Sequence, residues 1–261
     1  MRSKRIYCFH VESEPELERI NRIAGQLKKK APVAIRVNPN VDAKTHKKIT
    51  TGTYDNKFGI AFEKIPGVYT RAAKLKNIHL RGLQMHIGSQ LTQVAPFDAA
   101  VRKVAPLAVK LKDQHGIEFL SIGGGLGIPY DNEQPPSPKE YGTMVKEVVG
   151  DLDCKIFFEP GRLIAGNAGI LVTRVVRVKK GTARTFIIVD AAMNDLVRPT
   201  LYNAHHAIVP VNEAPDGAKL TEVEVVGPIC ETGDTFGRQF LPEPGEGDLL
   251  AIRTAGAYGA V

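Results

Sequence analysis

Short apolar runs alternate regularly with longer helical patterns from the first residues to about residue 165, and this alternation limits the possible fold classes. Short runs of branched apolar side chains are typical of buried strands, and their alternation with helices predicts βα units around a parallel sheet. Five strands and four intervening helices are expected. The strands are 6–11, 33–37, 80–86, 119–122 and 155–159, and the helices are 14–29, 63–75, 97–115 and 138–152.

The pattern changes after residue 168. Strand-like runs then follow one another at 170–178, 185–189, 220–226 and 248–254, with no long helical pattern between them. Such a series is typical of a β-rich domain. We therefore predict two domains, at residues 1–168 and 169–261.

Polar or glycine residues stand at the ends of the five expected strands. They are Glu12, Asn38, His86, Gly123 and Glu159. In a (β/α)₈ barrel the active site is built at the carboxyl ends of the strands, so this distribution favours a barrel. A closed barrel needs eight strands and about 250 residues. The sequence thus predicts the last five βα units of an incomplete barrel and part of a β-rich C-terminal domain. We expect the chain to be truncated at both ends.

The charge and cysteine content narrow the classes of partner. Lys and Arg number 35 against 28 Asp and Glu, a net charge of +7, but the basic residues lie in short scattered groups that favour solvated faces over a nucleic-acid surface. No stretch approaches the roughly 18 apolar residues of a membrane span. Cys8, Cys154 and Cys230 share no metal-ligand spacing, and an odd count favours a reducing compartment. We expect a cytoplasmic protein without a metal, membrane or nucleic-acid partner.

The run Gly123-Gly124-Gly125-Leu126-Gly127 follows an expected strand. Glycine backbone amides can approach an anion closely because no side chain stands in the way, which indicates a phosphate cradle. A plain strand-to-helix turn explains the run equally well. The spacing differs from the dinucleotide-binding pattern.

The segment Glu159-Pro160-Gly161-Arg162 lies at the end of another expected strand. A carboxylate there can hold a pyridine nitrogen protonated, and an arginine can grip a carboxylate or phosphate with two hydrogen bonds. The alternative is a surface salt bridge after a turn.

The segment His86-Ile87-Gly88-Ser89 places an imidazole at a third strand end and a hydroxyl three residues later. The imidazole could stack on a flat cofactor while the serine bonds its phosphate. A single histidine is also commonly a satisfied structural residue.

Taken together, His86–Ser89, Gly123–Gly125, Glu159–Arg162 and Cys230-Glu231-x-x-Asp234 resemble, in order, the signatures of pyridoxal-phosphate decarboxylases with the alanine-racemase-like fold. Further segments look like the diaminopimelate decarboxylase family rather than its ornithine or arginine relatives. These segments are 36–39, 42–46, 51–52, 56–60 and 198–199 with Tyr202. The resemblance implies decarboxylation of meso-2,6-diaminopimelate to L-lysine in lysine biosynthesis, by a homodimer.

The resemblance also implies pyridoxal 5'-phosphate as the cofactor and a role for each matching residue. Cys230 would be the catalytic proton donor, reaching the active site of the opposite subunit. From the residues alone, Cys230 could instead be a buried thiol and Tyr202 a packed surface aromatic. The cofactor-binding set would be His86, Ser89, Gly123, Gly124, Gly125, Glu159, Pro160, Gly161, Arg162 and Tyr258, and the substrate-binding set Arg162, Arg198, Tyr202, Glu231 and Tyr258.

One departure from the family pattern concerns the cofactor lysine. The family carries its Schiff-base lysine on the first barrel strand, in a Tyr-Ala-x-Lys-type motif, and no such motif occurs here. Lys4 stands in an Arg-Ser-Lys-Arg setting that does not suit a buried, activated amine. We therefore expect the chain alone to be inactive. The alternatives are a non-catalytic dimerising or regulatory fragment, and an ornithine or arginine decarboxylase of the same fold.

Overall fold

The computed structural model describes residues 6–261. Lys4, whose sequence setting does not suit the cofactor lysine, lies outside the described residues. The chain divides into two compact units. The first holds the described residues up to Gly127 together with Pro135–Pro160, and the second holds Ile128–Gln134 and Gly161–Val261. A short loop between two strands of the first unit therefore belongs to the second.

The first unit is built on a parallel sheet with the strand order β1-β2-β4-β5-β6. Its strands are β1 (Phe9–Val11), β2 (Ala31–Asn38), β3 (Ile60–Ala61), β4 (Ile78–Met85), β5 (Phe119–Ser121) and β6 (Lys155–Phe157). The five predicted strands are confirmed and neighbour one another in chain order, as in part of a barrel. The two-residue β3, which pairs with β2, was not predicted. Residues 6–8 lie outside β1, so the first predicted strand was too long.

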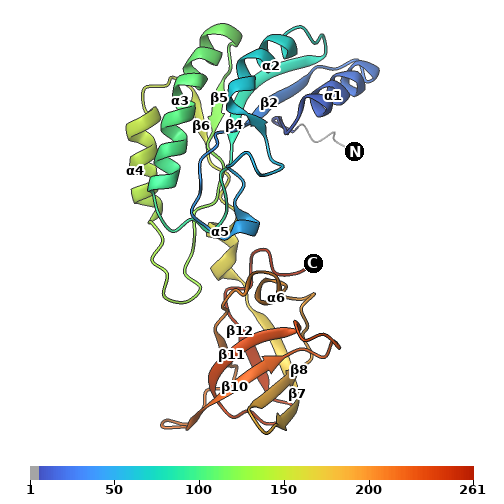
Figure 1. Cartoon of the computed structure of the whole chain (residues 1–261), viewed down its shortest axis with the longest axis vertical. Coiled ribbons are helices and arrows are strands. Elements are labelled where there is room, and N and C mark those ends of the chain that lie inside the picture. Colours follow the sequence, from blue (N-terminus) through green and yellow to red (C-terminus); the bar gives the residue numbers. More distant parts are fainter. Residues whose placement is uncertain (1–5) are drawn as a thin grey trace. The chain divides into compact units, whose positions relative to one another are not determined.

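Helices alternate with these strands (Figure 1). They are α1 (Glu14–Gln26), α2 (Ile65–Ala72), α3 (Ala95–His115) and α4 (Pro138–Val149), and short 3₁₀ turns cover Lys47–Ile49 and Phe62–Lys64. Helix α4 begins with a capping box, in which Ser137 Oγ accepts from the Glu140 amide and the Glu140 carboxylate accepts from the Ser137 amide. Helix α3 ends at Gly116, whose φ of 67° suits glycine.

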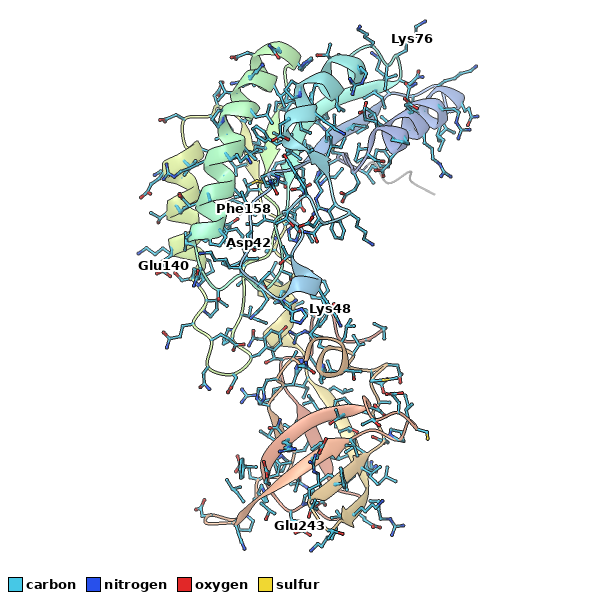
Figure 2. All side chains as sticks on the ribbon, in the orientation of Figure 1. Asp42, Lys48, Lys76, Glu140, Phe158 and Glu243 are labelled. Carbon is cyan, nitrogen blue, oxygen red and sulfur yellow. The ribbon has the colours of Figure 1, made fainter. Side chains whose placement is uncertain are left out.

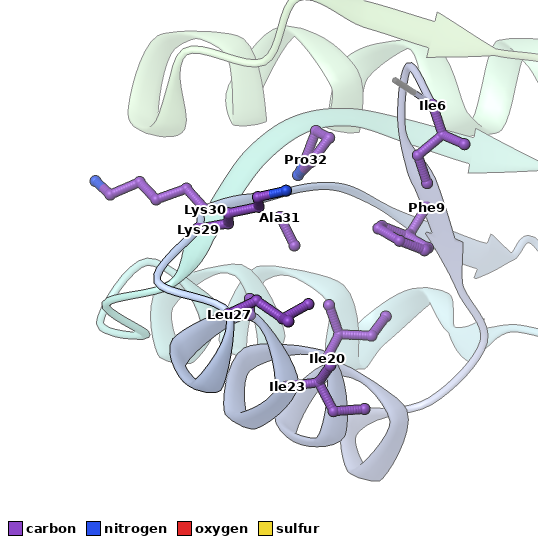
Figure 3. Close-up of a pocket in the computed structure, with 10 residues that line it drawn as sticks. Ile6, Phe9, Ile20, Ile23, Leu27, Lys29, Lys30, Ala31 and Pro32 are labelled. Atoms are coloured by element: carbon purple, nitrogen blue, oxygen red, sulfur yellow. The ribbon is translucent and has the colours of Figure 1, made fainter. Parts of the chain in front are cut away.

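A hollow of about 750 Å³ lies between α1, β1 and the start of β2 (Figure 3). Its walls are apolar and include Phe9, Ile20, Ile23, Leu27 and Pro32. The predicted site residues are not among those that line it. It is a hollow beside β1, an edge strand of the sheet, and not the candidate site.

The second unit is a six-stranded sheet with the order β11-β10-β8-β7-β12-β9. Its pairs are antiparallel except for β8 and β10. Ile187, Val225, Leu250 and Ile252 are fully buried in its core. The β-rich part of the predicted fold is confirmed.

The elements of the second unit, in chain order, are α5 (Arg162–Ala165), a 3₁₀ turn (Gly166–Ala168), β7 (Leu171–Lys180), β8 (Thr185–Val189), α6 (Arg198–Tyr202), β9 (Ile208–Pro210), β10 (Leu220–Val226), β11 (Thr235–Pro242) and β12 (Leu249–Ile252).

Strands β9 and β11 were not predicted, for a physical reason. Strand β11 contains Gly237 at a φ of 94°, and its register with β10 shifts between Val225 and Val226. Such a bulge breaks the alternation of apolar and polar side chains by which a strand is recognised. Strand β9 has only three residues and ends in Pro210.

Most charged side chains lie on the outside, and Lys76 and Glu140 point away from the sheet of the first unit (Figure 2). Several form surface pairs, such as Arg102 Nε with Asp98 at 2.9 Å. Across residues 6–261, no helix is long and apolar enough to cross a bilayer, and no histidine, cysteine and carboxylate side chains gather as a metal site would require.

Candidate active site

Three turns meet at the carboxyl ends of neighbouring strands in the first unit. His86 follows β4, the glycine run follows β5 and Glu159 follows β6. The Glu159 backbone amide donates to the Gly123 carbonyl at 2.8 Å, and the Gly124 amide donates to His86 Nδ1 at 3.3 Å. The structure thus brings three of the predicted positions side by side.

The three glycines allow these turns to touch. A Cβ atom on Gly123 would lie 2.4 Å from the Met85 carbonyl oxygen, and one on Gly125 would lie 2.2 Å from that of Gly88. On Gly124 it would lie 2.1 Å from the Glu159 carbonyl oxygen. No side chain fits at such distances, so the run is more than an ordinary turn. Its glycines let the neighbouring turns pack backbone against backbone.

Glu159 is held by uncharged donors and one histidine. Ser121 Oγ donates to Glu159 Oε1 at 2.6 Å, and Gln84 Nε2 lies 3.4 and 3.3 Å from the two carboxylate oxygens. His10 Nδ1 lies 3.4 Å from Oε1. Within residues 6–261 no lysine or arginine forms an ion pair with this carboxylate, whose side chain is 39% exposed. It remains available to a cation from outside the chain.

His86 is a neutral ring at the end of β4. Burial lowers its pKa to about 4, and the charge of Arg36 adds to this effect. Its backbone carbonyl accepts from Arg36 Nη2 at 3.2 Å and from Thr51 Oγ1 at 3.0 Å. Arg36 is held in turn by Glu12 at 2.5 Å. His86 is therefore a satisfied residue in a fixed position, and its flat neutral ring is also suited to stacking.

Ser89 lies in the turn after β4. Its backbone amide donates to the Ile49 carbonyl at 3.1 Å, and its carbonyl accepts from Thr45 Oγ1 at 2.9 Å. The segment that contains Thr45 and Ile49 thus fixes the backbone of this turn.

In the second unit, Arg162 and Arg198 are the first residues of α5 and α6, and each is only 6% exposed. Both lie around Tyr130, which belongs to the loop Ile128–Gln134. Arg198 Cζ lies 3.9 Å from the centre of the Tyr130 ring, and Arg162 Nη1 donates to the Tyr130 hydroxyl. Arg162 Cζ also lies 4.9 Å from the ring centre of Tyr258. The burial of Arg162 contradicts a surface salt bridge with Glu159.

Gly161 lies directly before this cluster. A Cβ on Gly161 would come within 2.9 Å of the Tyr258 hydroxyl oxygen, so this glycine allows the tyrosine to approach. Tyr258 itself is 62% exposed. Pro160 is the last residue of the first unit.

The loop after β10 carries Cys230 and Glu231. Cys230 is exposed, so the buried-thiol alternative is wrong. Asp234, which is 3% exposed, accepts from the amides of Met193 at 2.7 Å and Ile229 at 2.8 Å and so holds the loop. Tyr202, the last residue of α6, is partly buried, as a packed surface aromatic would be. Burial lowers the pKa of Arg198, and Tyr202 acts in the opposite direction.

Sequence reasoning missed residues that contact predicted site residues. Ser121, Gln84 and His10 contact Glu159, and Tyr130 and His206 contact Arg198. Ser121 and Gln84 lie on strands that were predicted, two or three residues from recognised motifs, so alternation along those strands could have found them. Tyr130 and His206 had no local signal, because the fold of the second unit brings them to Arg198.

Residues 1–166 match the family model described as pyridoxal-dependent decarboxylase, pyridoxal binding domain. The chain belongs to the pyridoxal-dependent decarboxylases. It is 48% identical over 257 residues to a diaminopimelate decarboxylase of Vibrio cholerae and, over the same length, to one of Pseudomonas aeruginosa. In both comparisons the matched region covers 98% of this chain and 61% of the relative. The chain thus spans about three fifths of the length of these relatives.

Solved structures agree with this assignment. A Helicobacter pylori diaminopimelate decarboxylase complexed with L-lysine superposes with a TM-score of 0.92 at 40% identity, covering 98% of this chain and 64% of that one. The predicted membership in the pyridoxal-phosphate decarboxylases, and with it the pyridoxal cofactor, is thereby confirmed.

The arrangement in this decarboxylase chain fits pyridoxal phosphate. Gly123, Gly124 and Gly125 let the three strand-end turns pack backbone against backbone, because a Cβ on any of them would overlap a neighbouring carbonyl oxygen. Glu159 presents a carboxylate without a lysine or arginine counter-ion among residues 6–261, as a protonated pyridine nitrogen requires.

Proposed function

We propose that this chain is the greater part of a diaminopimelate decarboxylase, which converts meso-2,6-diaminopimelate to L-lysine and carbon dioxide. The observation that carries the proposal is the Glu159 carboxylate, held by Ser121 and Gln84 beside the glycine turns and the His86 ring. Its support comes from the 48% identity to relatives of that name.

The first unit would hold the cofactor. The glycine turns and Ser89 would bind the phosphate, His86 would stack on the ring, and Glu159 would face the pyridine nitrogen. Bound pyridoxal phosphate supplies an electron sink for the electron pair released when carbon dioxide leaves. Glu159 stabilises the protonated ring nitrogen because its carboxylate carries the opposite charge. Pro160, Gly161, Arg162 and Tyr258 would complete the cofactor site.

The second unit would recognise the substrate. Arg162, Arg198 and Tyr202, with Tyr258, would bind carboxylate groups, because guanidinium groups form paired charge-assisted hydrogen bonds with them. Glu231 would bind the distal ammonium group. Cys230, exposed on its loop, would donate the proton that replaces the departing carboxylate, and would do so in the opposite subunit of a homodimer.

We further infer that the chain is a fragment of a cytoplasmic enzyme. The described part contains Cys8, Cys154 and Cys230 as free thiols, in keeping with a reducing compartment. The family's lysine motif is absent from the 261 residues, so the chain alone should not turn over substrate.

The test is a chimaera in which the corresponding first part of the Vibrio cholerae relative precedes this chain. We expect release of carbon dioxide and formation of L-lysine from meso-diaminopimelate, and neither from the chain alone. Cys230→Ser should lower kcat, whereas Cys154→Ser, at a partly buried thiol beside the Ile117 carbonyl, should not. Turnover of ornithine or arginine, with none of diaminopimelate, would contradict the proposed substrate.

A further inference from the structure

His206 lies between Arg198 and the backbone of the second unit. His206 Nε2 is 2.7 Å from Arg198 Nη1, and His206 Nδ1 is 2.9 Å from the Arg253 carbonyl oxygen. The carbonyl can only accept, so Nδ1 carries the ring proton and Nε2 is an acceptor. Arg198 therefore donates to the ring. Each of the two ring nitrogens has a single role.

The ring is anchored to the sheet on two sides. Arg253 directly follows β12, and the His206 carbonyl accepts from Gln239 Nε2 on β11 at 3.1 Å. His206 itself is fully buried. A buried ring with its position set by two strands is a rigid point from which to hold a long, otherwise mobile side chain.

The environment keeps this ring neutral. Burial lowers the pKa of His206 to about 4; the hydrogen bond to the Arg253 carbonyl acts in the opposite direction, and the charges of Arg198, His205 and Arg162 lower the pKa further. A neutral ring can accept from a guanidinium, whereas a protonated ring would have no acceptor and would repel it. The contact is thus a stable hydrogen bond near neutral pH.

The remaining contacts of Arg198 leave donors for a ligand. Its guanidinium stacks on Tyr130, with Cζ 3.9 Å from the ring centre, and its Nη1 is bonded to His206. Its Nε is buried and has no hydrogen-bond partner among residues 6–261. A buried donor without a partner is costly, and a carboxylate would satisfy it with paired charge-assisted bonds.

We propose that His206 is a positioning residue that orients the Arg198 guanidinium, against the face of Tyr130, for a carboxylate of the substrate. His206 does not touch the substrate. The inference rests on the proposed function for the identity of the ligand, but the orientation of Arg198 can be measured without it.

Two substitutions separate the two ring nitrogens. In His206→Asn the side-chain amide nitrogen can take the place of Nδ1 and keep the bond to Arg253, but nothing reaches Arg198. In His206→Gln the longer side chain can place its oxygen near the position of Nε2 and accept from Arg198 again. His205→Asn, at the exposed neighbouring histidine, is the matched control.

The first readout is calorimetric titration of the 261-residue chain with L-lysine at neutral pH. We expect His206→Asn to weaken binding about 10- to 100-fold, as loss of a charge-assisted hydrogen bond would do, and His206→Gln to restore most of it. His205→Asn should bind as the unaltered chain does. Equal affinity in His206→Asn and the unaltered chain would overturn the proposal.

The second readout is the nitrogen NMR spectrum of the histidine rings and arginine side chains, which does not depend on a ligand. We expect the ring proton on Nδ1 of His206. The Arg198 guanidinium should rotate slowly in the unaltered chain and in His206→Gln, and freely in His206→Asn. A proton on Nε2, or equal rotation in all variants, would overturn the positioning role. If the unaltered chain shows the expected spectra but does not bind L-lysine, the positioning of Arg198 stands and its assignment to a ligand carboxylate is wrong; the substrate itself is decided by the chimaera.

Discussion

Each unit holds charged side chains in place, a carboxylate in the first and two guanidinium groups in the second, but the surroundings that hold them differ. In the first, Glu159 is partly exposed and is oriented by neutral donors at the ends of parallel strands. In the second, Arg162 and Arg198 are buried against an aromatic ring, and one is bonded to a neutral histidine. The first arrangement suits a cationic ring and the second suits carboxylates. We therefore expect Glu159 to contribute to cofactor binding and Arg198 to substrate binding.

The largest expected effect concerns the close approach of turns in the first unit. Gly124→Ala would place a Cβ 2.1 Å from the Glu159 carbonyl oxygen, where only backbone could move aside. We expect the free energy of unfolding to fall by about 2–4 kcal/mol, measured by denaturant titration. Gly142→Ala in helix α4 is the control, since nothing lies within 4 Å of its added Cβ and stability should rise by up to about 1 kcal/mol. Equal outcomes for both would contradict the tight contact.

The next effect tests a carboxylate of the second unit that acts structurally. Asp234→Ala leaves the backbone amides of Met193 and Ile229 without their acceptor. We expect a loss of about 2–3 kcal/mol and faster hydrogen exchange at those two amides. Asp216→Ala, at an exposed aspartate, should change stability by less than about 0.5 kcal/mol. Unchanged exchange at Met193 and Ile229 would mean that Asp234 does not hold the Cys230 loop.

A smaller effect measures how firmly Glu159 is oriented. Ser121→Ala removes the 2.6 Å hydrogen bond to Glu159 and should cost about 1 kcal/mol. A double-mutant cycle with Glu159→Gln should give a coupling energy of roughly 0.5–1.5 kcal/mol. Strict additivity of the two substitutions would show that the serine does not hold the carboxylate.

The smallest effect is the pH dependence that His86 contributes. Its pKa is about 4 in the folded chain against an ordinary value of 6.5, so the unfolded chain binds more protons between these values. Stability from this group is complete above pH 6.5 and is lost as the pH falls toward 4. Between pH 7 and 6 the loss should be roughly 0.7 kcal/mol, and His86→Gln should remove it. An unaltered slope of melting temperature against pH in that variant would contradict the neutral, buried ring.

The sequence predicted the two units to different degrees. In the first, strand ends in a parallel sheet must meet at one edge, so His86, Gly123 and Glu159 could be placed together from local patterns alone. In the second, Arg198 was found only by resemblance to a family. Its partners Tyr130 and His206 come from a loop that leaves the first unit and from the segment after α6, and no periodicity links such positions.

Binding of pyridoxine 5'-phosphate tests the proposed roles of Glu159 and Arg198 most directly. This compound has the cofactor's ring and phosphate but no aldehyde to react with lysines. Its dissociation constant can be measured by calorimetry for the unaltered chain, Glu159→Gln and Arg198→Ala. We expect Glu159→Gln to weaken binding about tenfold or more, through loss of a charge-assisted hydrogen bond, and Arg198→Ala to leave it unchanged. Equal affinity for all three proteins, or a loss confined to Arg198→Ala, would contradict the proposed roles.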